Sequence, residues 1–303
     1  AVWPFVTGWV ALAQYRYHNA HAGRFALDAI VHTGFDESLG RNPEVLSGRV
    51  YKSLDTSVPH QFFATSMVLT PLVRGLLGVD VDAPAGRVRV APHLPADWDT
   101  VHVEHLAVGD ARLSLRLTRE GRSLGLYVKR EGIERGTPII VEFAPALPLG
   151  ASRVMVSHET EAPAPGVTTQ HPGAVVVRDS ATLGDAVSLR ASWTGGWELI
   201  PPSHAVRIGD RSRALRVVSE RMRDTRYVVQ LEGRAGATYA VRVRAPGGAP
   251  ATMEVLPANA PMMPVRMSDP DHDGWVTVTV EFPSQGGDAD DYIALSLAFV
   301  GRA

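Results

Sequence analysis

The chain has 303 residues, of which 45% are hydrophobic, and its formal net charge is −2. That length and apolar content allow at least one large core, and by length two domains are expected. The charge gives no basic field that would attract nucleic acid or an anionic membrane surface, so neither is expected as a partner. The absence of cysteine excludes disulfides and thiolate metal ligands but leaves the cellular compartment open.

The chain begins with AVWPF, which has neither an initiator methionine nor the pattern of a signal peptide. We therefore expect it to be the C-terminal part of a longer protein, with the N-terminal part of the same polypeptide as its partner. No run of about eighteen apolar residues occurs, so no membrane-spanning helix is predicted.

Apolar residues recur with helical spacing in the first quarter of the chain. The first helix has apolar residues on two neighbouring stripes and is therefore expected to be buried on more than one side. A second helix is predicted at residues 22–32. A third is predicted to begin with Ser57 as N-cap and Pro59 in its first turn, with a kink at Pro71.

After Gly78 the pattern changes to alternation of polar and apolar residues, as in RVRVAP, ARLSLRLTR and SLGLYVKR. Such segments separated by turn residues predict an antiparallel sandwich. Similar segments after residue 197 fit either a second sandwich or a continuation of the first. The predicted organisation is therefore helices at 1–80, a β-sandwich at 81–196, and a second sandwich or continuation at 197–303.

Four motifs follow one another in residues 1–118: VWPFVTGWVALAQYRY, NPEVLSG, SVPHQFFATSMVLTPLVRGLLGV and VRVAPHLPADWDTVHVEHLAVGDARLSL. Together they resemble the C-terminal end of six-hairpin, (α/α)6 glycosidases, in particular bacterial proteins of the glycogen debranching enzyme, or amylo-α-1,6-glucosidase, type. The resemblance implies an α+β multidomain protein in which the last helices of an incomplete (α/α)6 toroid precede antiparallel β-sandwich regions. It also implies an inverting glycoside hydrolase for α-glucosidic oligosaccharides of the debranching type. The same fold could serve another sugar, such as a rhamnoside.

Inverting hydrolysis needs two carboxyl groups, roughly 6.5 to 9.5 Å apart, one as general acid and one as general base. In the enzymes that the chain resembles, the base is a Glu in the loop before the last helix, and Glu44 in PEVLSG is the matching residue. Glu37 in FDESLG is the rival base, because a shift of one loop would exchange the two. For Glu44 the alternative is an ordinary solvated loop carboxylate. The acid would lie outside this chain, so the fragment alone is expected to be inactive.

Aromatic side chains could supply the flat apolar faces that sugar rings need. Trp3, beside Pro4 at a helix start, is the best stacking candidate, and Tyr17 is a second candidate for contact with the substrate. For Trp9 a core position is expected.

Polar side chains are needed to bind the sugar hydroxyls. His60 and Gln61, in the first turn of the predicted last helix, are expected to face Glu44. Arg16 could bind a hydroxyl or form an ion pair with Asp28.

The segment DPDHDG places Asp269, Asp271 and Asp273 at alternate positions of a calcium loop. Its twelfth position is Val280 instead of Glu and its flank is a strand, so an EF-hand is rejected. An Asx-rich hairpin turn is expected, with a sandwich-loop calcium site as the alternative. Neither a metal site nor another cofactor is predicted.

No phosphate-binding glycine loop and no Gly-x-Ser-x-Gly motif occur, so phosphoryl transfer and esterase chemistry lack support. A non-catalytic carbohydrate-binding or scaffold protein, with the β region as its working part, is the alternative function.

Overall fold

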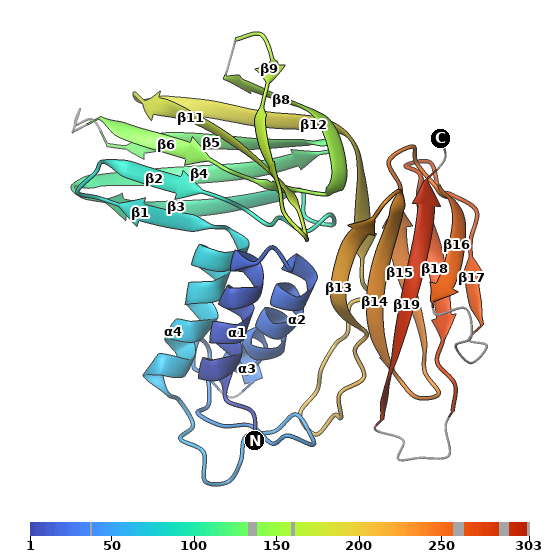
Figure 1. Ribbon diagram of the computed structural model, residues 1–303. Coiled ribbons are helices and arrows are strands. Elements are labelled where there is room, and N and C mark those ends of the chain that lie inside the picture. The colour runs from blue at the N-terminus through green and yellow to red at the C-terminus, as the bar shows by residue number, and fades with distance from the viewer. Residues whose placement is uncertain (37, 133–137, 159–160, 257–263, 285–290, 302–303) are drawn as a thin grey trace. The chain divides into compact units, whose positions relative to one another are not determined.

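The structure is a computed structural model, and it describes all residues except 37, 133–137, 159–160, 257–263, 285–290 and 302–303 (Figure 1). Strands take up 50% of the described residues and helices 16%. The fold is therefore β-rich, and the prediction of an α+β protein containing the last helices of an (α/α)6 toroid is wrong. Helical spacing of apolar residues shows that helices pack against something, but it does not specify a ring of hairpins.

The helical segment consists of α1 (Pro4–Arg16), α2 (Ala20–Val31), α3 (Thr33–Asp36) and α4 (Phe62–Thr70), which continues as the π-helical η1 (Pro71–Leu76). The last helix begins at Phe62 and not at the predicted Ser57. Ser57 does not cap it, because its hydroxyl accepts a hydrogen bond from the backbone N–H of Val45 at 3.0 Å. At Pro71, where a kink is predicted, the structure has a change from α-helical to π-helical geometry.

Close packing of α1 against the other helices depends on glycines. A Cβ atom on Gly8 would lie 2.0 Å from the backbone oxygen of Met67, so α1 and α4 are in backbone contact there. The buried ring of Tyr15 fits against Gly23 and Gly75, where added Cβ atoms would lie 3.1 and 2.6 Å from it. Each of these three glycines leaves room that a larger residue would fill.

The opposite side of α1 is not covered by the described residues. Trp9 is 52% exposed, and Val6 and Val10 are exposed to a similar extent. The prediction that Trp9 is a core residue is therefore wrong. Helix α1 packs against both α2 and α4, but the part of its apolar surface that includes Val6 and Val10 is exposed. No helix in the described ranges is long and apolar enough to cross a membrane.

The chain divides into two compact units, one made of Ala1–Leu76 with Trp197–Ala303 and the other of Leu77–Gly196. The second unit contains two sheets. One has the order β1-β2-β6-β11-β10 and the other includes β3, β4, β5, β12, β8 and β9. Strands β2 and β6 pair in parallel, whereas the pairings β1-β2, β6-β11, β7-β11, β10-β11, β3-β4, β4-β5, β5-β12 and β8-β9 are antiparallel. The strands are β1 (Val79–Asp82), β2 (Arg87–Val90), β3 (Thr100–Val108), β4 (Ala111–Glu120), β5 (Ser123–Glu131), β6 (Ile139–Phe143), β7 (Ala146–Leu147), β8 (Leu149–His158), β9 (Ala164–Pro165), β10 (Val167–Gln170), β11 (Val175–Leu183) and β12 (Ala186–Ile200).

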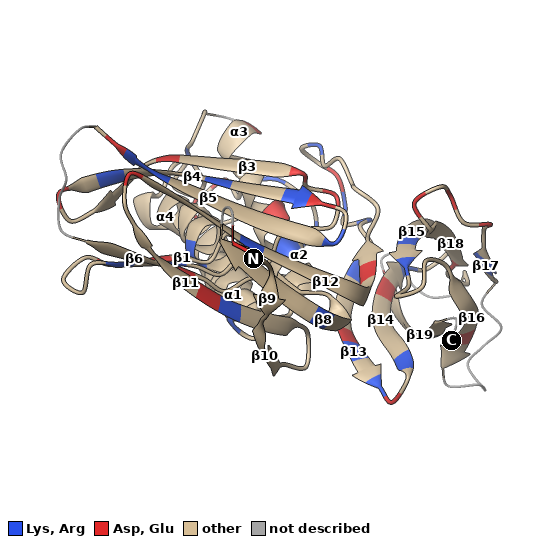
Figure 2. Ribbon diagram, turned by 90° about the horizontal axis from the view of Figure 1, so that it is seen from above, with Lys and Arg blue, Asp and Glu red and all other residues tan. Residues whose placement is uncertain are grey.

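Alternating residues of these strands are buried, as the period-two pattern predicts. On β4 the buried residues are Leu113, Leu115 and Leu117, and their neighbours point to the other face. Basic and acidic residues are interspersed over the strands (Figure 2), and several form ion pairs such as Arg89 with Glu142 at 3.2 Å. The alternating segments between residues 79 and 200 are thus confirmed as strands.

The C-terminal strands form one further sheet and also extend the sheet that contains β12. The further sheet has the order β13-β14-β19-β16, whereas β15, β18 and β17 continue the β12 sheet from the end of β12. Their core contains Trp197 stacked on Tyr227, with ring centroids 5.1 Å apart. The strands are β13 (Arg216–Arg223), β14 (Arg226–Arg234), β15 (Thr238–Arg244), β16 (Pro250–Leu256), β17 (Val265–Met267), β18 (Trp275–Glu281) and β19 (Tyr292–Gly301).

Helix α2 is joined to β13 of the same unit by two contacts. The His21 ring lies 3.6 Å from the Glu220 carboxylate. One helical turn later, the guanidinium of Arg216 lies 5.8 Å from the centre of the Phe25 ring. The helical segment and the C-terminal strands therefore form one unit although 120 residues separate them in the chain.

Candidate functional site

The loop between α3 and α4 is held by backbone hydrogen bonds within itself and to the start of the chain. The Glu44 N–H donates to the Val58 carbonyl at 3.0 Å, and the Gln61 N–H donates to the Asn42 carbonyl at 2.9 Å. Val2 and Leu46 exchange two hydrogen bonds of 2.8 Å. The start of the chain, the PEVLSG segment and the approach to α4 are thereby brought side by side.

The Glu44 side chain is half-buried in this loop. Within the part of the chain that the structure describes, its carboxylate forms no hydrogen bond or ion pair. A carboxylate that is fixed through its backbone but has unused oxygens can accept a proton or a hydrogen bond from a bound molecule. The geometry is thus compatible with a general base, and equally with a solvated loop carboxylate.

Two aromatic side chains near this loop are open to solvent. Trp3 is 42% exposed and is the N-cap residue of α1, directly after the Val2 bridge to Leu46. Phe62, the first residue of α4, is 88% exposed. Its neighbour Phe63 packs edge-on against Phe5, with ring centroids 4.9 Å apart. Trp3 and Phe62 therefore offer apolar surface close in sequence to the paired segments.

His60 and Gln61 precede α4 and do not lie in its first turn as predicted. Gln61 is the N-cap residue and is partly buried, whereas His60 is exposed. The Gln61 backbone is tied to Asn42, two residues before Glu44. The backbone bond to Asn42 therefore places Gln61, and His60 directly before it in the chain, beside the segment that contains Glu44.

Arg16 and Tyr17 lie at the far end of α1 from Trp3. Thirteen helical residues span roughly 20 Å, so the structure does not bring these two residues to the Glu44 loop. Tyr17 is 76% exposed. Asp28, the alternative partner expected for Arg16, pairs with Arg24 at 3.5 Å. The rival base Glu37 lies outside the described residues.

Several residues that fix the loop were not singled out from the sequence. Asn42 is 2% exposed and is joined to α2, α3 and α4 by hydrogen bonds. The only signal for it was its position before a proline in NPEVLSG. The Tyr51 hydroxyl donates to the Asp36 carboxylate, and burial together with this bond raises the pKa of Tyr51. The Tyr51 backbone also exchanges hydrogen bonds with Gly209 and Asp210, at 2.8 and 2.7 Å.

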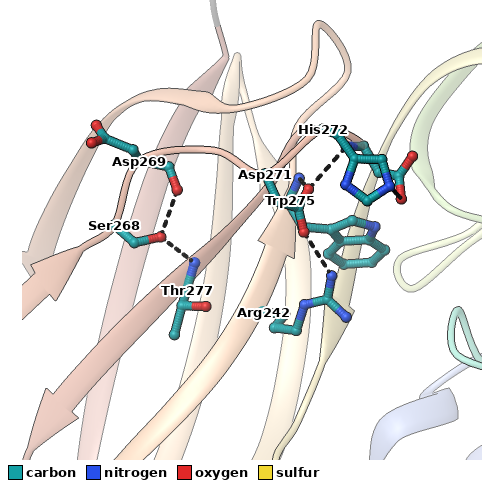
Figure 3. A network of polar contacts seen from close by, with 8 residues as sticks. Arg242, Ser268, Asp269, Asp271, His272, Trp275 and Thr277 are labelled. Carbon is teal, nitrogen blue, oxygen red and sulfur yellow. Dashed lines mark hydrogen bonds and ion pairs between the residues drawn. The ribbon is translucent and has the colours of Figure 1, made fainter.

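The DPDHDG segment forms a hairpin turn stabilised by one aspartate, as expected (Figure 3). The Asp271 carboxylate accepts hydrogen bonds from the backbone N–H groups of Asp273 and Trp275 at 3.0 and 2.9 Å, and pairs with Arg242 at 3.0 Å. Partial burial acts to raise the pKa of Asp271, but the two N–H donors and Arg242 lower it overall. Its oxygens are therefore occupied by the protein. No group of three or more possible metal ligands was found among the described residues.

A second polar cluster lies on β3, β4 and β5. The Glu131 carboxylate accepts hydrogen bonds from the Ser114 hydroxyl at 2.5 Å and the His105 backbone N–H at 2.9 Å, and contacts the His105 ring at 2.7 Å. These hydrogen bonds lower the pKa of Glu131 to about 2, and the bond from Ser114 has the largest effect. His105 has a φ of 59° in a β-bulge, so Glu131 stabilises a backbone conformation that is unfavourable for histidine.

No protein-family model matches this chain, and no curated protein matches it. A solved structure named "Glycoside hydrolase" is weakly similar, with a TM-score of 0.35 and 8% sequence identity. The similarity covers 98% of this chain and 51% of that one, so the chain spans about half the length of that protein. This similarity does not support an assignment to the glycogen debranching family.

Proposed function

We propose that this chain belongs to a glycoside hydrolase, that the Glu44 loop is part of its sugar site, and that Glu44 is the general base. The observation that carries the proposal is the backbone pairing of three chain segments. It gathers Glu44, Trp3, His60 and Gln61, which were selected from the sequence for complementary roles. These residues supply an acceptor for a proton, an apolar ring and hydrogen-bonding groups, which are the components of a sugar site.

In this proposal the Glu44 carboxylate deprotonates the water that attacks the anomeric carbon. A base of this kind must have an oxygen available to the water, and Glu44 forms no side-chain hydrogen bond or ion pair within the described ranges. Trp3 provides a stacking face, and His60 and Gln61 bind sugar hydroxyls. Asp36, at the end of α3, already accepts the Tyr51 hydroxyl, and no residue is assigned as the general acid.

Saccharide titration followed by amide and indole NMR signals tests the site without requiring turnover. We expect maltose, isomaltose or a rhamnoside to shift the signals of Trp3, Glu44, His60 and Gln61, and we expect Trp3→Ala to remove these shifts. Trp9→Ala is the matched control, because Trp9 is also about half exposed on the same helix. Shifts that are absent for all three saccharides, or that depend equally on both tryptophans, would argue against a sugar site.

The catalytic role is tested in an active form of the protein. Glu44→Gln should lower kcat by about 10² to 10⁴ with KM nearly unchanged. Asp55→Asn, a change of a highly exposed acid in the same loop, should have no such effect. Azide should restore turnover to Glu44→Ala, with a β-glycosyl azide as product of an α-glycoside. Saccharide binding together with full activity of Glu44→Gln would instead favour a non-catalytic role for this loop.

A further inference from the structure

Asn42 is the most buried polar side chain of the Glu44 loop, with 2% exposure. Its side-chain nitrogen donates to the Ile30 carbonyl at 3.2 Å and to the Thr33 hydroxyl oxygen at 2.6 Å. Its backbone carbonyl accepts from the Gln61 N–H at 2.9 Å, and its N–H donates to the Thr65 hydroxyl at 3.4 Å. One residue thus joins the end of α2, the start of α3 and the start of α4.

The direction of these bonds requires an amide at this position. The Thr33 hydroxyl donates its own proton to the Ile30 carbonyl at 2.7 Å, so both oxygens that face Asn42 act as acceptors. An amide nitrogen supplies two protons to them, whereas a carboxylate would place a third acceptor there. The hydrogen bonds of a buried polar group are costly to leave unmade. The site therefore distinguishes asparagine from aspartate, although the two side chains have nearly the same shape.

Glu44 follows Asn42 by two residues, with Pro43 between them. Proline restricts its own φ to near −65°, so the backbone between Asn42 and Glu44 has few alternative conformations. On the other side, the buried Leu46 is held by its two hydrogen bonds to Val2. The Glu44 backbone is thus fixed from both directions while its side chain remains available.

We propose that Asn42 is a positioning residue for the Glu44 carboxylate: it fixes the start of the loop relative to α4, so that Glu44 faces the residues that precede this helix. This inference rests on the proposed function of Glu44, because positioning has a catalytic meaning only if Glu44 acts on a substrate. Asn42 itself does not touch the substrate.

The first test is native-state amide exchange of Asn42→Asp. Protection of the Glu44 and Gln61 amides should fall by about tenfold or more, while amides in the middle of α1 and α2 keep theirs. Asn19→Asp is the matched control, because Asn19 also donates its side-chain N–H, to Gln14 at 2.9 Å, and lies in the same helical segment. It should leave the Glu44 and Gln61 amides unchanged. If Asn42→Asp does not fold, Asn42→Ala removes the same side-chain donors without adding an acceptor.

Unchanged protection of the Glu44 amide, or an equal loss in all the helices, would overturn the inference, because the role of Asn42 would then be absent or merely structural. The second test uses an active form of the protein. Asn42→Asp should lower kcat more than it raises KM, and Asn42→Asp combined with Glu44→Gln should be no slower than Glu44→Gln alone. Additive losses would also overturn it. If Glu44→Gln itself has full activity, the proposed function fails, whereas the exchange result still decides whether Asn42 fixes the loop.

Discussion

The unit Leu77–Gly196 and the helical segment differ in how well they cover their own apolar side chains. In the unit, the inward residues of β4 and β5 are almost completely buried, whereas the outer side of α1 leaves Val6, Trp9 and Val10 about half exposed. Two packed sheets cover each other, because each strand has only one inward face. A helix that is apolar around its circumference needs neighbours on several sides. An apolar pattern in the sequence thus predicts which surface of a helix or strand is apolar. It does not predict whether neighbouring residues of the same segment bury that surface.

The largest effect is expected from shortening a residue in the covered core of the sandwich. Leu126 is 1% exposed on β5, between Leu117 and Leu189 on the neighbouring strands. Leu126→Ala should lower the free energy of unfolding by about 2 to 5 kcal/mol in urea titrations. Val10→Ala on the outer side of α1 should change it by no more than about 0.5 kcal/mol. Equal losses would show that the outer side of α1 is covered in solution.

A smaller loss is expected where helix packing depends on a glycine. An added methyl group at Gly8 would meet the Met67 carbonyl at 2.0 Å, so Gly8→Ala must move α1 away from α4 and should destabilise the protein by about 1 to 3 kcal/mol. At Gly184 an added methyl group would have no atom within 4 Å. Gly184→Ala is therefore the control, and thermal unfolding of both variants is the measurement. Equal stability of the two would contradict the close approach of the helices.

The third prediction concerns the acid range and the bulge on β3. Because the pKa of Glu131 is lowered from 4.5 to about 2, its hydrogen bonds stabilise the folded state fully above about pH 4.5. This stabilisation is lost as the pH falls towards about 2, since the unfolded chain then binds the proton more readily. Urea midpoints measured from pH 6 to pH 2 should therefore fall more steeply for the wild type than for Glu131→Gln. Glu104→Gln, at an exposed neighbour in the bulge, should keep the wild-type slope.

The smallest effect is expected from calcium. A site saturated at 100 times its dissociation constant would stabilise the fold by about 2.7 kcal/mol. Because the Asp271 oxygens already bind two backbone N–H groups and Arg242, we expect the melting temperature to be the same in calcium and in EDTA. A clear rise with calcium would show that Asp269 and Asp273 can recruit Asp271 away from these partners.

The sequence was informative where a pattern is local. Alternation located the strands, and proline at position 71 located the irregular helix geometry. The prediction of a toroid was wrong because it depended on a resemblance of motifs. The predicted start of the last helix was wrong because the Ser57 hydroxyl accepts a hydrogen bond from Val45 across the loop and does not cap the helix. In the candidate site, the segments around Glu44 and Gln61 could be selected from the sequence. The role of Asn42 could not, because it depends on three helices that meet only in the folded chain.

The pairing of α2 with β13 has a consequence for the order in which the chain can fold during synthesis. Helix α2 emerges from the ribosome long before β13, because residues 77–196 lie between them. This intervening stretch is itself a compact unit. The sandwich can therefore form while the nascent chain is still growing. The contacts of His21 and Phe25 on α2 cannot form until Glu220 and Arg216 have been translated. At synthesis rates of about 5 to 20 residues per second, that delay lasts on the order of ten seconds or more, during which this surface is available to chaperones.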